Sequence, residues 1–400
     1  MSRSRRLVVV GASLAGMRAV AAARDAGHRG PITVVGAEDE LPYDRPRLSK
    51  AFLDAGTDPV VPTYHGADSL DAEFRLGTRA TGLDTASRTV VAGGETLRYD
   101  ALVIATGADA RRLPGFSHVD GVRSLRTVAD ARAIRGAFDS RARVAIVGAG
   151  FVGVEVASSA RARGLDVTMV EALPAPMTRS LGATVGSLLS GLHAENGTVL
   201  HCGVTVARIE GDGRVERIVL SDGRVVAADL VLVATGAEPA TGWLAGSGLT
   251  VRDGVVCDEH LAAGPPGVYA AGDVARWRNP LFGRHMRLEH WTNAAEQGEI
   301  AGRNAVGPHI APCASVPYFW SDFYGHRVQF VGLPSEEDVE VVGDVAEYRF
   351  VVLYREGDRL AGALAVDSRG LVPRLRALVR NRAHWSAAVA AMAKPVLAAG

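Results

Sequence analysis

The chain has 400 residues, 48% of them apolar, and its 44 basic residues balance its 44 acidic ones. This length predicts two or three domains, because one hydrophobic core rarely fills so many residues. Zero net charge and the lack of an apolar run of roughly 18 residues argue against nucleic acid and membrane as partners.

The first predicted element is an apolar strand with a glycine-rich turn and an alanine-rich helix, LVVVGASLAGMRA (7–19). Basic residues precede it, as they would in a secretory signal peptide. We favour a strand that enters a nucleotide-binding turn, because the same pattern recurs as VAIVGAGFVGVEVA (144–157). A second pair, ALVIATGAD (101–109) and LVLVATGAE (230–238), follows the two turns in the same order. The repeats predict two dinucleotide-binding domains.

The glycines of each turn have separate expected roles. Gly148 allows the tight turn, Gly150 lets backbone N–H groups approach a pyrophosphate, and Gly153 lets the helix pack against the strand. The pyrophosphate then lies at a helix N-terminus, which favours an anion. In the first turn Ser13 takes the middle position. The remaining expected contacts are Gly11, Leu14, Ala15, Gly16, Ala105, Thr106 and Gly107 in the first unit, and Phe151, Val152, Thr235 and Gly236 in the second.

Each unit also needs an acid for a ribose hydroxyl, about 20 residues after its first glycine. Glu171 lies 23 residues after Gly148, and its charge would repel a 2′-phosphate, so it predicts NADH over NADPH. In the first unit Glu38 lies 27 residues after Gly11, with Ala37 as a backbone contact.

A short strand that ends in Gly-Asp, VYAAGDVA (268–275), identifies the first nucleotide. Gly272 and Asp273 would hydrogen-bond the ribityl chain of a flavin. We therefore assign FAD to the first unit and NADH to the second. Because Gly-Asp follows the second unit, the flavin domain is interrupted by the NADH domain.

These motifs, with PYDRPRLSK (42–50), LEHWTNAAEQG (288–298) and PYFWSDFYG (317–325), resemble the FAD-dependent, NADH-using ferredoxin reductases. The resemblance runs from about residue 5 to the C-terminus, with departures at Ser13, Arg47 and Phe323. It implies an α/β fold with two Rossmann-like, glutathione-reductase-like domains and a C-terminal α+β domain. The implied domains are 1–112 with 241–311 for FAD, 113–240 for NADH, and 312–400, where residues 339–367 predict three strands.

The resemblance also implies site residues. Lys50 would lie beside the flavin ring, with Glu155 and Glu289 near the same region as catalytic residues. Only Lys50 and Lys394 are lysines, and a compact ammonium crowds a flavin less than a guanidinium fork does. The other implied FAD contacts are Arg45, Ala80, Arg126, His290, Trp291 and Trp320.

The implied activity is transfer of hydride from NADH to FAD, and of single electrons to a small iron–sulfur ferredoxin. That carrier would serve a haem monooxygenase or a ring-hydroxylating dioxygenase. Two alternatives remain: an NADH oxidase or disulfide reductase, and a signalling flavoprotein of the apoptosis-inducing-factor type. The first needs a redox cysteine near the flavin, yet no cysteine precedes Cys202. The second is expected to carry long inserts or nucleic-acid-binding basic tracts, and this sequence has neither.

The remaining predictions concern surroundings and docking. The chain has three cysteines, spaced 55 and 56 residues apart: Cys202, Cys257 and Cys313. This number and spacing are typical of neither a disulfide framework nor a metal site, so they favour a reducing compartment, the cytoplasm. An acidic ferredoxin would dock on a basic patch, for which 276–287 and 371–382 are the candidates.

Overall fold

The computed structural model describes residues 5–56, 63–64, 70–116, 119–307, 312–335 and 337–396. They form two compact units, each built from three stretches of chain. Unit 1 contains Met1–Asp44, Pro62–Asp109 and Glu238–Pro317; unit 2 contains Arg45–Val61, Ala110–Ala237 and Tyr318–Gly400. The chain passes between the units within β8 (Ala108–Ala110) and β17 (Ala237–Pro239). Residue 311, the predicted end of the flavin domain, lies outside the described residues.

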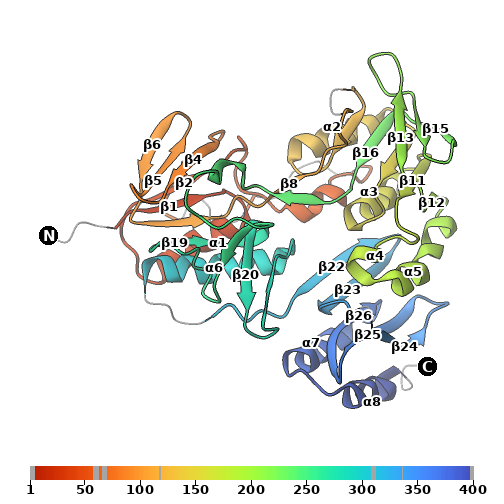
Figure 1. The fold of residues 1–400 in the computed structure, drawn as a ribbon. Coiled ribbons are helices and arrows are strands. Elements are labelled where there is room, and N and C mark those ends of the chain that lie inside the picture. Colours follow the sequence, from red (N-terminus) through yellow and green to blue (C-terminus); the bar gives the residue numbers. More distant parts are fainter. Residues whose placement is uncertain are drawn as a thin grey trace. The chain divides into compact units, whose positions relative to one another are not determined.

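A five-stranded parallel sheet forms the centre of unit 1 (Figure 1). Its order is β19-β7-β1-β2-β3. The strands are β1 (Leu7–Val10), β2 (Ile32–Val35), β3 (Glu73–Arg75), β7 (Ala101–Ile104) and β19 (Val268–Ala270). All residues of β1 and β7 are buried, as continuous apolar runs predict for a sheet covered on both faces.

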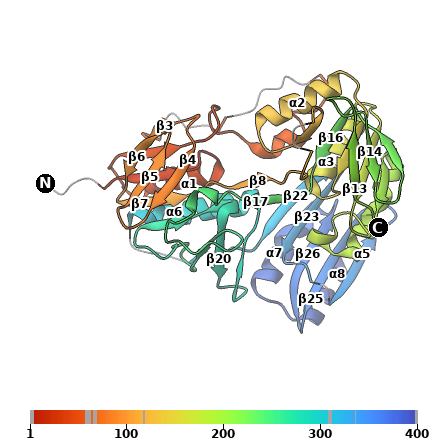
Figure 2. The same ribbon diagram turned by 45° about the horizontal axis from the view of Figure 1, so that its top comes forward.

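Two helices of unit 1, α1 (Leu14–Asp25) and α6 (Trp291–Val306), run side by side in Figures 1 and 2. Their backbones touch through glycines of α6. A Cβ on Gly298 would stand 2.3 Å from the Ala15 carbonyl oxygen, and one on Gly302 would stand 2.1 Å from that of Ala19. This packing places the first glycine turn, at the start of α1, beside α6, the helix that begins at Trp291.

Two small sheets complete unit 1. One is antiparallel, in the order β4-β5-β6; the other has the order β18-β20-β21. Their bounds are β4 (Ala80–Asp84), β5 (Thr89–Ala92), β6 (Glu95–Arg98), β18 (Val255–Cys257), β20 (Ala275–Asn279) and β21 (Arg284–Met286).

Unit 2 contains a second five-stranded parallel sheet, in the order β12-β11-β10-β16-β9. The strands are β9 (Val122–Ser124), β10 (Val144–Val147), β11 (Val167–Glu171), β12 (Val199–Cys202) and β16 (Leu230–Val233). The helices are α2 (Val128–Asp139), α3 (Phe151–Ala162), α4 (Thr178–Leu181) and α5 (Ala183–Glu195). A three-stranded antiparallel sheet adds β13 (Val206–Glu210), β14 (Arg217–Leu220) and β15 (Val225–Ala227).

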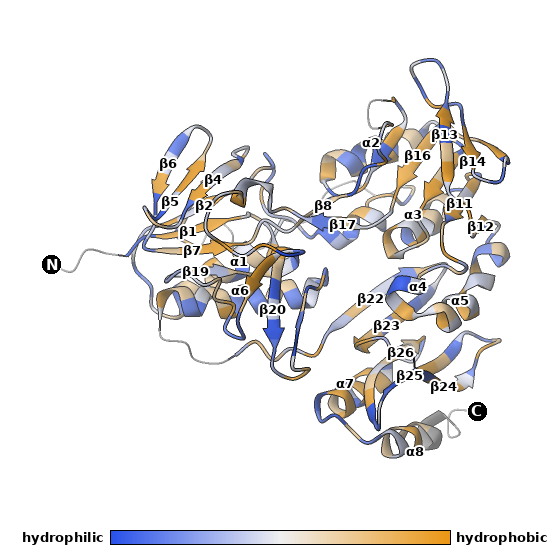
Figure 3. Ribbon diagram, in the orientation of Figure 1, coloured by the Kyte–Doolittle hydropathy of each residue, from blue (hydrophilic) through white to orange (hydrophobic). Residues whose placement is uncertain are grey.

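Apolar side chains from this parallel sheet and from β14 form one buried cluster, which includes Val147, Val170, Ile218, Leu220 and Val231. The same strands are predominantly hydrophobic in Figure 3. Burial of this cluster holds the sheet against the antiparallel one.

The predicted repeat is confirmed in the strand pairing. β1 lies between β2 and β7, and β10 lies between β11 and β16. The backbone N–H of Gly11 donates to Val35 at 2.8 Å, and that of Gly148 donates to Val170 at 2.8 Å. The two units therefore share one strand–turn–helix design, as the α/β prediction requires.

The C-terminal part of unit 2 is an antiparallel sheet in the order β22-β23-β26-β25-β24. The strands are β22 (Tyr318–Phe323), β23 (His326–Gly332), β24 (Asp338–Asp344), β25 (Arg349–Glu356) and β26 (Arg359–Val366). The last three confirm the strands predicted in 339–367. Two helices follow, α7 (Val372–Arg380) and α8 (Trp385–Val396). Among the described residues, no helix is both long and apolar enough to cross a membrane.

Candidate functional site

The first glycine turn joins β1 to α1 and leaves no room for side chains at its outer positions. A Cβ on Gly11, whose φ is +120°, would stand 2.0 Å from the Ala105 carbonyl oxygen. One on Gly16 would stand 1.8 Å from the Gly11 carbonyl oxygen. Ser13 is the N-cap of α1, and its side chain makes no capping bond within the described residues. The first N–H groups of α1 are therefore not capped by this serine, as an anion site at a helix N-terminus needs.

The second turn repeats this geometry between β10 and α3. Gly148 has φ +104°, and a Cβ there would stand 2.4 Å from the Ala234 carbonyl oxygen. A Cβ on Gly153 would stand 2.2 Å from the Gly148 carbonyl oxygen. Around Gly150, by contrast, no described atom beyond its own chain neighbours lies within 4 Å of the Cβ position. Glycine at 150 keeps this space open, which fits the close approach of a pyrophosphate.

Glu171 ends β11 and faces the second turn. Its Oε2 accepts the Ala149 N–H at 2.8 Å, and its Oε1 accepts the Leu173 N–H at 2.9 Å. These bonds orient the carboxylate, and each oxygen keeps a second acceptor position for a ribose hydroxyl. Glu38, after β2, instead accepts the Tyr43 hydroxyl at 2.5 Å.

The Gly-Asp motif lies in a short 3-10 helix, Gly272–Val274. Gly272 has φ +78°, and its N–H donates to Gln297 Oε1 of α6 at 2.9 Å. Gln297 Nε2 and both amide atoms of Asn293 are buried and have no partner among the described residues. A buried amide without a partner is costly, so these groups fit a polar ligand at the start of α6, such as a flavin.

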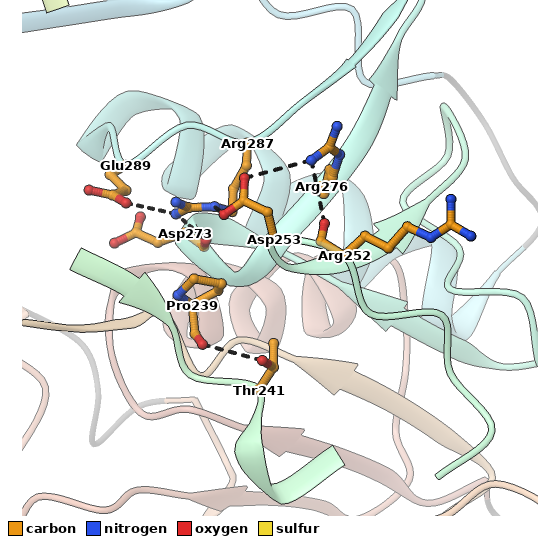
Figure 4. Close-up of polar contacts among 8 residues, drawn as sticks. All are labelled: Pro239, Thr241, Arg252, Asp253, Asp273, Arg276, Arg287 and Glu289. Atoms are coloured by element: carbon orange, nitrogen blue, oxygen red, sulfur yellow. Dashed lines mark hydrogen bonds and ion pairs between the residues drawn. The ribbon is translucent and has the colours of Figure 1, made fainter. Parts of the chain in front are cut away.

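Arg287 ties this motif to two acids, as Figure 4 shows. Its Nη1 donates to the Asp273 carbonyl oxygen at 3.2 Å and to Glu289 Oε1 at 2.7 Å, and its Nε donates to Asp253 at 3.1 Å. The Arg287 side chain is only 12% exposed. One guanidinium therefore holds the backbone of Asp273 and the side chain of Glu289 in place.

The residues directly after Glu289 are half-buried at the start of α6. Burial lowers the pKa of His290 to about 4, so the imidazole is neutral at pH 7. The indole N–H of Trp291 donates to Asp44 at 3.1 Å. The Thr106 hydroxyl donates to the Ala240 carbonyl oxygen at 2.9 Å, so a flavin contact of Thr106 would use its backbone.

In unit 2, Lys50 and Glu155 lie together. Lys50 Nζ stands 2.6 Å from Glu155 Oε1, and Glu155 is only 6% exposed. The hydroxyls of Ser49 and Ser321 also donate to this carboxylate. Neither serine was among the predicted site residues. Their one signal in the sequence was position, since Ser49 precedes Lys50 and Ser321 follows Trp320.

The other predicted residues of unit 2 have definite neighbours. Arg45 Nη1 donates to the backbone carbonyl of Arg126, and the Arg126 N–H donates to Asp130 at 3.0 Å. Trp320 stacks on Tyr318 with 6.0 Å between ring centroids, and Arg327 lies over its ring.

The predicted flavin residues are divided between the units. Most belong to unit 1, and the rest belong to unit 2. The unit 2 members are Arg45, Lys50, Arg126 and Trp320. In the described part of the chain, no three His, Cys, Asp or Glu side chains gather as a metal site would require.

The fold and the two glycine turns define an oxidoreductase with two dinucleotide sites. The family model of the pyridine nucleotide-disulphide oxidoreductases matches residues 5–298, and a "Reductase C-terminal" model matches residues 318–399. The chain belongs to the pyridine nucleotide-disulphide oxidoreductase family.

Named relatives cover most of the chain. The ferredoxin–NAD(+) reductase subunit of a benzene 1,2-dioxygenase system from Pseudomonas putida is 36% identical over 370 residues, 90% of this chain and 89% of the relative. Rhodocoxin reductase from Rhodococcus erythropolis is 34% identical, over 90% of this chain and 86% of the relative. The structure of the covalent putidaredoxin reductase–putidaredoxin complex matches with a TM-score of 0.90 and 29% identity, over 95% of this chain and 94% of that one.

Proposed function

We propose that this chain is an NADH-dependent ferredoxin reductase that binds FAD. The observation that carries the proposal is the combination in one chain of two glycine turns of the same geometry with a C-terminal reductase domain. Relatives that match about nine tenths of the chain include ferredoxin–NAD(+) reductases of dioxygenase systems. The carrier would be a small iron–sulfur ferredoxin that serves a haem monooxygenase or a ring-hydroxylating dioxygenase. The three cysteines are free thiols, which supports the cytoplasm as its location.

Each step has assigned residues. The turn at Gly11 and the amides of Asn293 and Gln297 would hold FAD, and the turn at Gly150 with Glu171 would hold NADH. Bound FAD would supply the chemistry that turns a hydride donor into a donor of single electrons. Lys50 would place a positive charge, compensated by Glu155, on the nicotinamide side of the site. Arg287 would position Asp273 and Glu289.

A thiol-based reaction is disfavoured. Burial raises the pKa of Cys257, and it raises the pKa of Cys313 to about 12. Burial, and then the nearby Glu171 charge, raise the pKa of Cys202. A redox thiol needs a lowered pKa, so none of the three is poised for disulfide exchange. A signalling flavoprotein remains the other alternative.

The decisive experiment has two parts. The purified protein should be yellow with bound FAD, and NADH should bleach that colour under anaerobic conditions. Rapid reduction of cytochrome c by NADH should then require added ferredoxin. A colourless protein that takes up no FAD would contradict the proposal, and equally fast NADH consumption by oxygen alone would favour an oxidase.

The two predicted docking patches differ in their ion pairs. Arg276 and Arg278 lie 3.7 Å and 3.8 Å from the carboxylates of Asp253 and Glu259. On α7, Arg374 and Arg380 are exposed and form no ion pair among the described residues. Their charge is available to an acidic partner, so we favour the α7 patch.

Reversing Arg374 and Arg380 to Glu should raise the KM for ferredoxin about fivefold or more at low salt, because rim charges steer an acidic partner. The wild-type enzyme should lose ferredoxin turnover steeply with added salt. Steady-state kinetics should show unchanged NADH–ferricyanide turnover. Arg278→Glu is the comparison: a larger effect there would move docking to 276–287.

A further inference from the structure

The carboxylate of Glu155 is bound by three donor residues that come from two separate segments of unit 2. Lys50 and Ser49 come from the 3-10 helix Arg45–Ser49 and the residue after it. Ser321 comes from β22 and donates to Oε1 at 2.5 Å. Ser321 is fully buried, so its hydroxyl faces this carboxylate and not solvent.

The two serines fill hydrogen-bond acceptor positions of the Glu155 carboxylate that Lys50 alone leaves unoccupied. A carboxylate has about four acceptor positions, and the ammonium takes one. A buried charge pair is stable only when further hydrogen bonds satisfy the remaining positions. Ser49 donates to Oε2 and Ser321 to Oε1, so each oxygen has a hydroxyl donor. This arrangement fixes the plane of the carboxylate as well as its charge.

Helix α3 carries Glu155 and also fastens both serine segments. The Ser159 hydroxyl, one turn after Glu155, donates to the Ser49 carbonyl oxygen at 3.1 Å. The Ser158 hydroxyl accepts the N–H of Tyr324, just beyond β22, at 2.7 Å. Tyr324 has φ +52°, and its hydroxyl lies 2.9 Å from that of Thr198. The two serine donors are thus held by backbone segments that α3 fixes in place.

We propose that Ser49 and Ser321 are positioning residues that hold the Glu155 carboxylate in one orientation beside Lys50 for the reaction with NADH. Through Ser321, reduction by NADH depends on the C-terminal segment that begins at β22. The inference rests on the proposed function, because that function places Lys50 and Glu155 on the nicotinamide side. The inference therefore gives the C-terminal segment a role in the reduction of the flavin by NADH.

The test compares Ser321→Ala, Ser321→Thr, Glu155→Gln and the double variant Ser321→Ala/Glu155→Gln as holoenzymes. Stopped-flow reduction by NADH should show a limiting rate about tenfold lower in Ser321→Ala, since a charge-assisted hydrogen bond is lost. Threonine keeps the donor and should restore most of the rate. In the double variant, Ser321→Ala should cause little further loss, because the two residues act through one bond.

The second readout is independent of turnover. Calorimetric titration with NAD⁺ should give a Kd within about twofold of wild type for Ser321→Ala, while the urea midpoint should show the same coupling to Glu155 as the rate. Ser140→Ala is the matched control, because it removes an exposed hydroxyl at the end of α2 that donates to the Gly136 carbonyl oxygen, and it leaves all three donors on Glu155. Its limiting rate should stay near that of wild type.

The outcomes separate the inference from the function on which it rests. If NADH does not reduce the wild-type flavin, the proposed function fails. If NADH reduces it but the losses from Ser321→Ala and Glu155→Gln are additive, or Ser140→Ala is equally slow, the inference is wrong. If Ser321→Ala gives no holoenzyme, Ser321→Cys, a weaker donor, replaces it in the same comparison.

Discussion

Lys50→Met is expected to slow anaerobic reduction of the bound flavin by NADH about a hundredfold. Methionine keeps an unbranched side chain, one atom shorter, but removes the charge that lies 2.6 Å from Glu155. Glu155 is 6% exposed, so it would be left as a buried carboxylate without its counter-charge. Removing one partner of such a pair costs about 3–5 kcal/mol of stability. A hundredfold loss of rate requires that about 2.7 kcal/mol of the lost interaction act on the transition state. Stopped-flow absorbance of the flavin measures the effect.

Two further variants test whether the charge or the shape of Lys50 controls the rate of flavin reduction. Lys50→Arg keeps the charge but introduces a planar fork, and it should also slow flavin reduction, by less than methionine does. The other lysine of the chain, Lys394, serves as the control, and Lys394→Met should leave the rate unchanged. A wild-type rate in Lys50→Arg would remove the argument that a compact ammonium is needed, and a wild-type rate in Lys50→Met would remove Lys50 from the mechanism.

Glu171→Ala is expected to lower kcat/KM for NADH about a hundredfold and to act mainly on KM. The carboxylate is oriented by the N–H groups of Ala149 and Leu173, so its remaining acceptor positions are directed at a ligand. Hydrogen bonds to a charged group contribute about 1.5–3 kcal/mol each, and they are lost in ground and transition states alike. Steady-state kinetics with NADH and NADPH should show that discrimination against NADPH falls, because a 2′-phosphate no longer meets a negative charge.

The controls for this prediction separate charge from local structure. Glu171→Gln keeps one carbonyl acceptor and should fall between wild type and Glu171→Ala. Glu216→Ala removes an exposed glutamate of the same unit and should change neither coenzyme's kinetics. An unchanged KM for NADH in Glu171→Ala would show that the ribose lies elsewhere.

The amino-acid sequence predicted the glycine turns because their geometry is local. Gly11 and Gly16 lie five positions apart, and a Cβ on Gly16 would clash with the carbonyl of Gly11 itself. Such a constraint can be read from the spacing of glycines along the sequence. The alternation of apolar strands and helices can be read from the spacing of apolar residues in the same way. The same holds for Glu171, which follows directly from a buried strand and bonds to the turn 22 residues earlier.

In the basic patch at 276–287, the local sequence pattern did not predict which arginine charges are available for docking. Its arginines formed a charge run in the sequence, but Arg276 and Arg287 share Asp253 in the folded unit. Arg287 also reaches Glu289 and the backbone of Asp273. Which acids neutralise an arginine depends on the segments that fold around it. A run of arginines in the sequence therefore does not tell whether their charges are exposed for docking or are paired with acids of the same unit.

The sequence by itself determined the two glycine turns and the pairing of the second turn with Glu171, because short-range sterics and strand period encode them. The class of protein followed from the resemblance that the motifs carry. Only the tertiary structure decided which groups surround Glu155. Ser49 and Ser321 lie 106 and 166 residues from it along the chain, and no periodicity links them. Their convergence follows from packing of α3 against β22 and the 3-10 helix, where a buried carboxylate requires donors from whichever segments adjoin it.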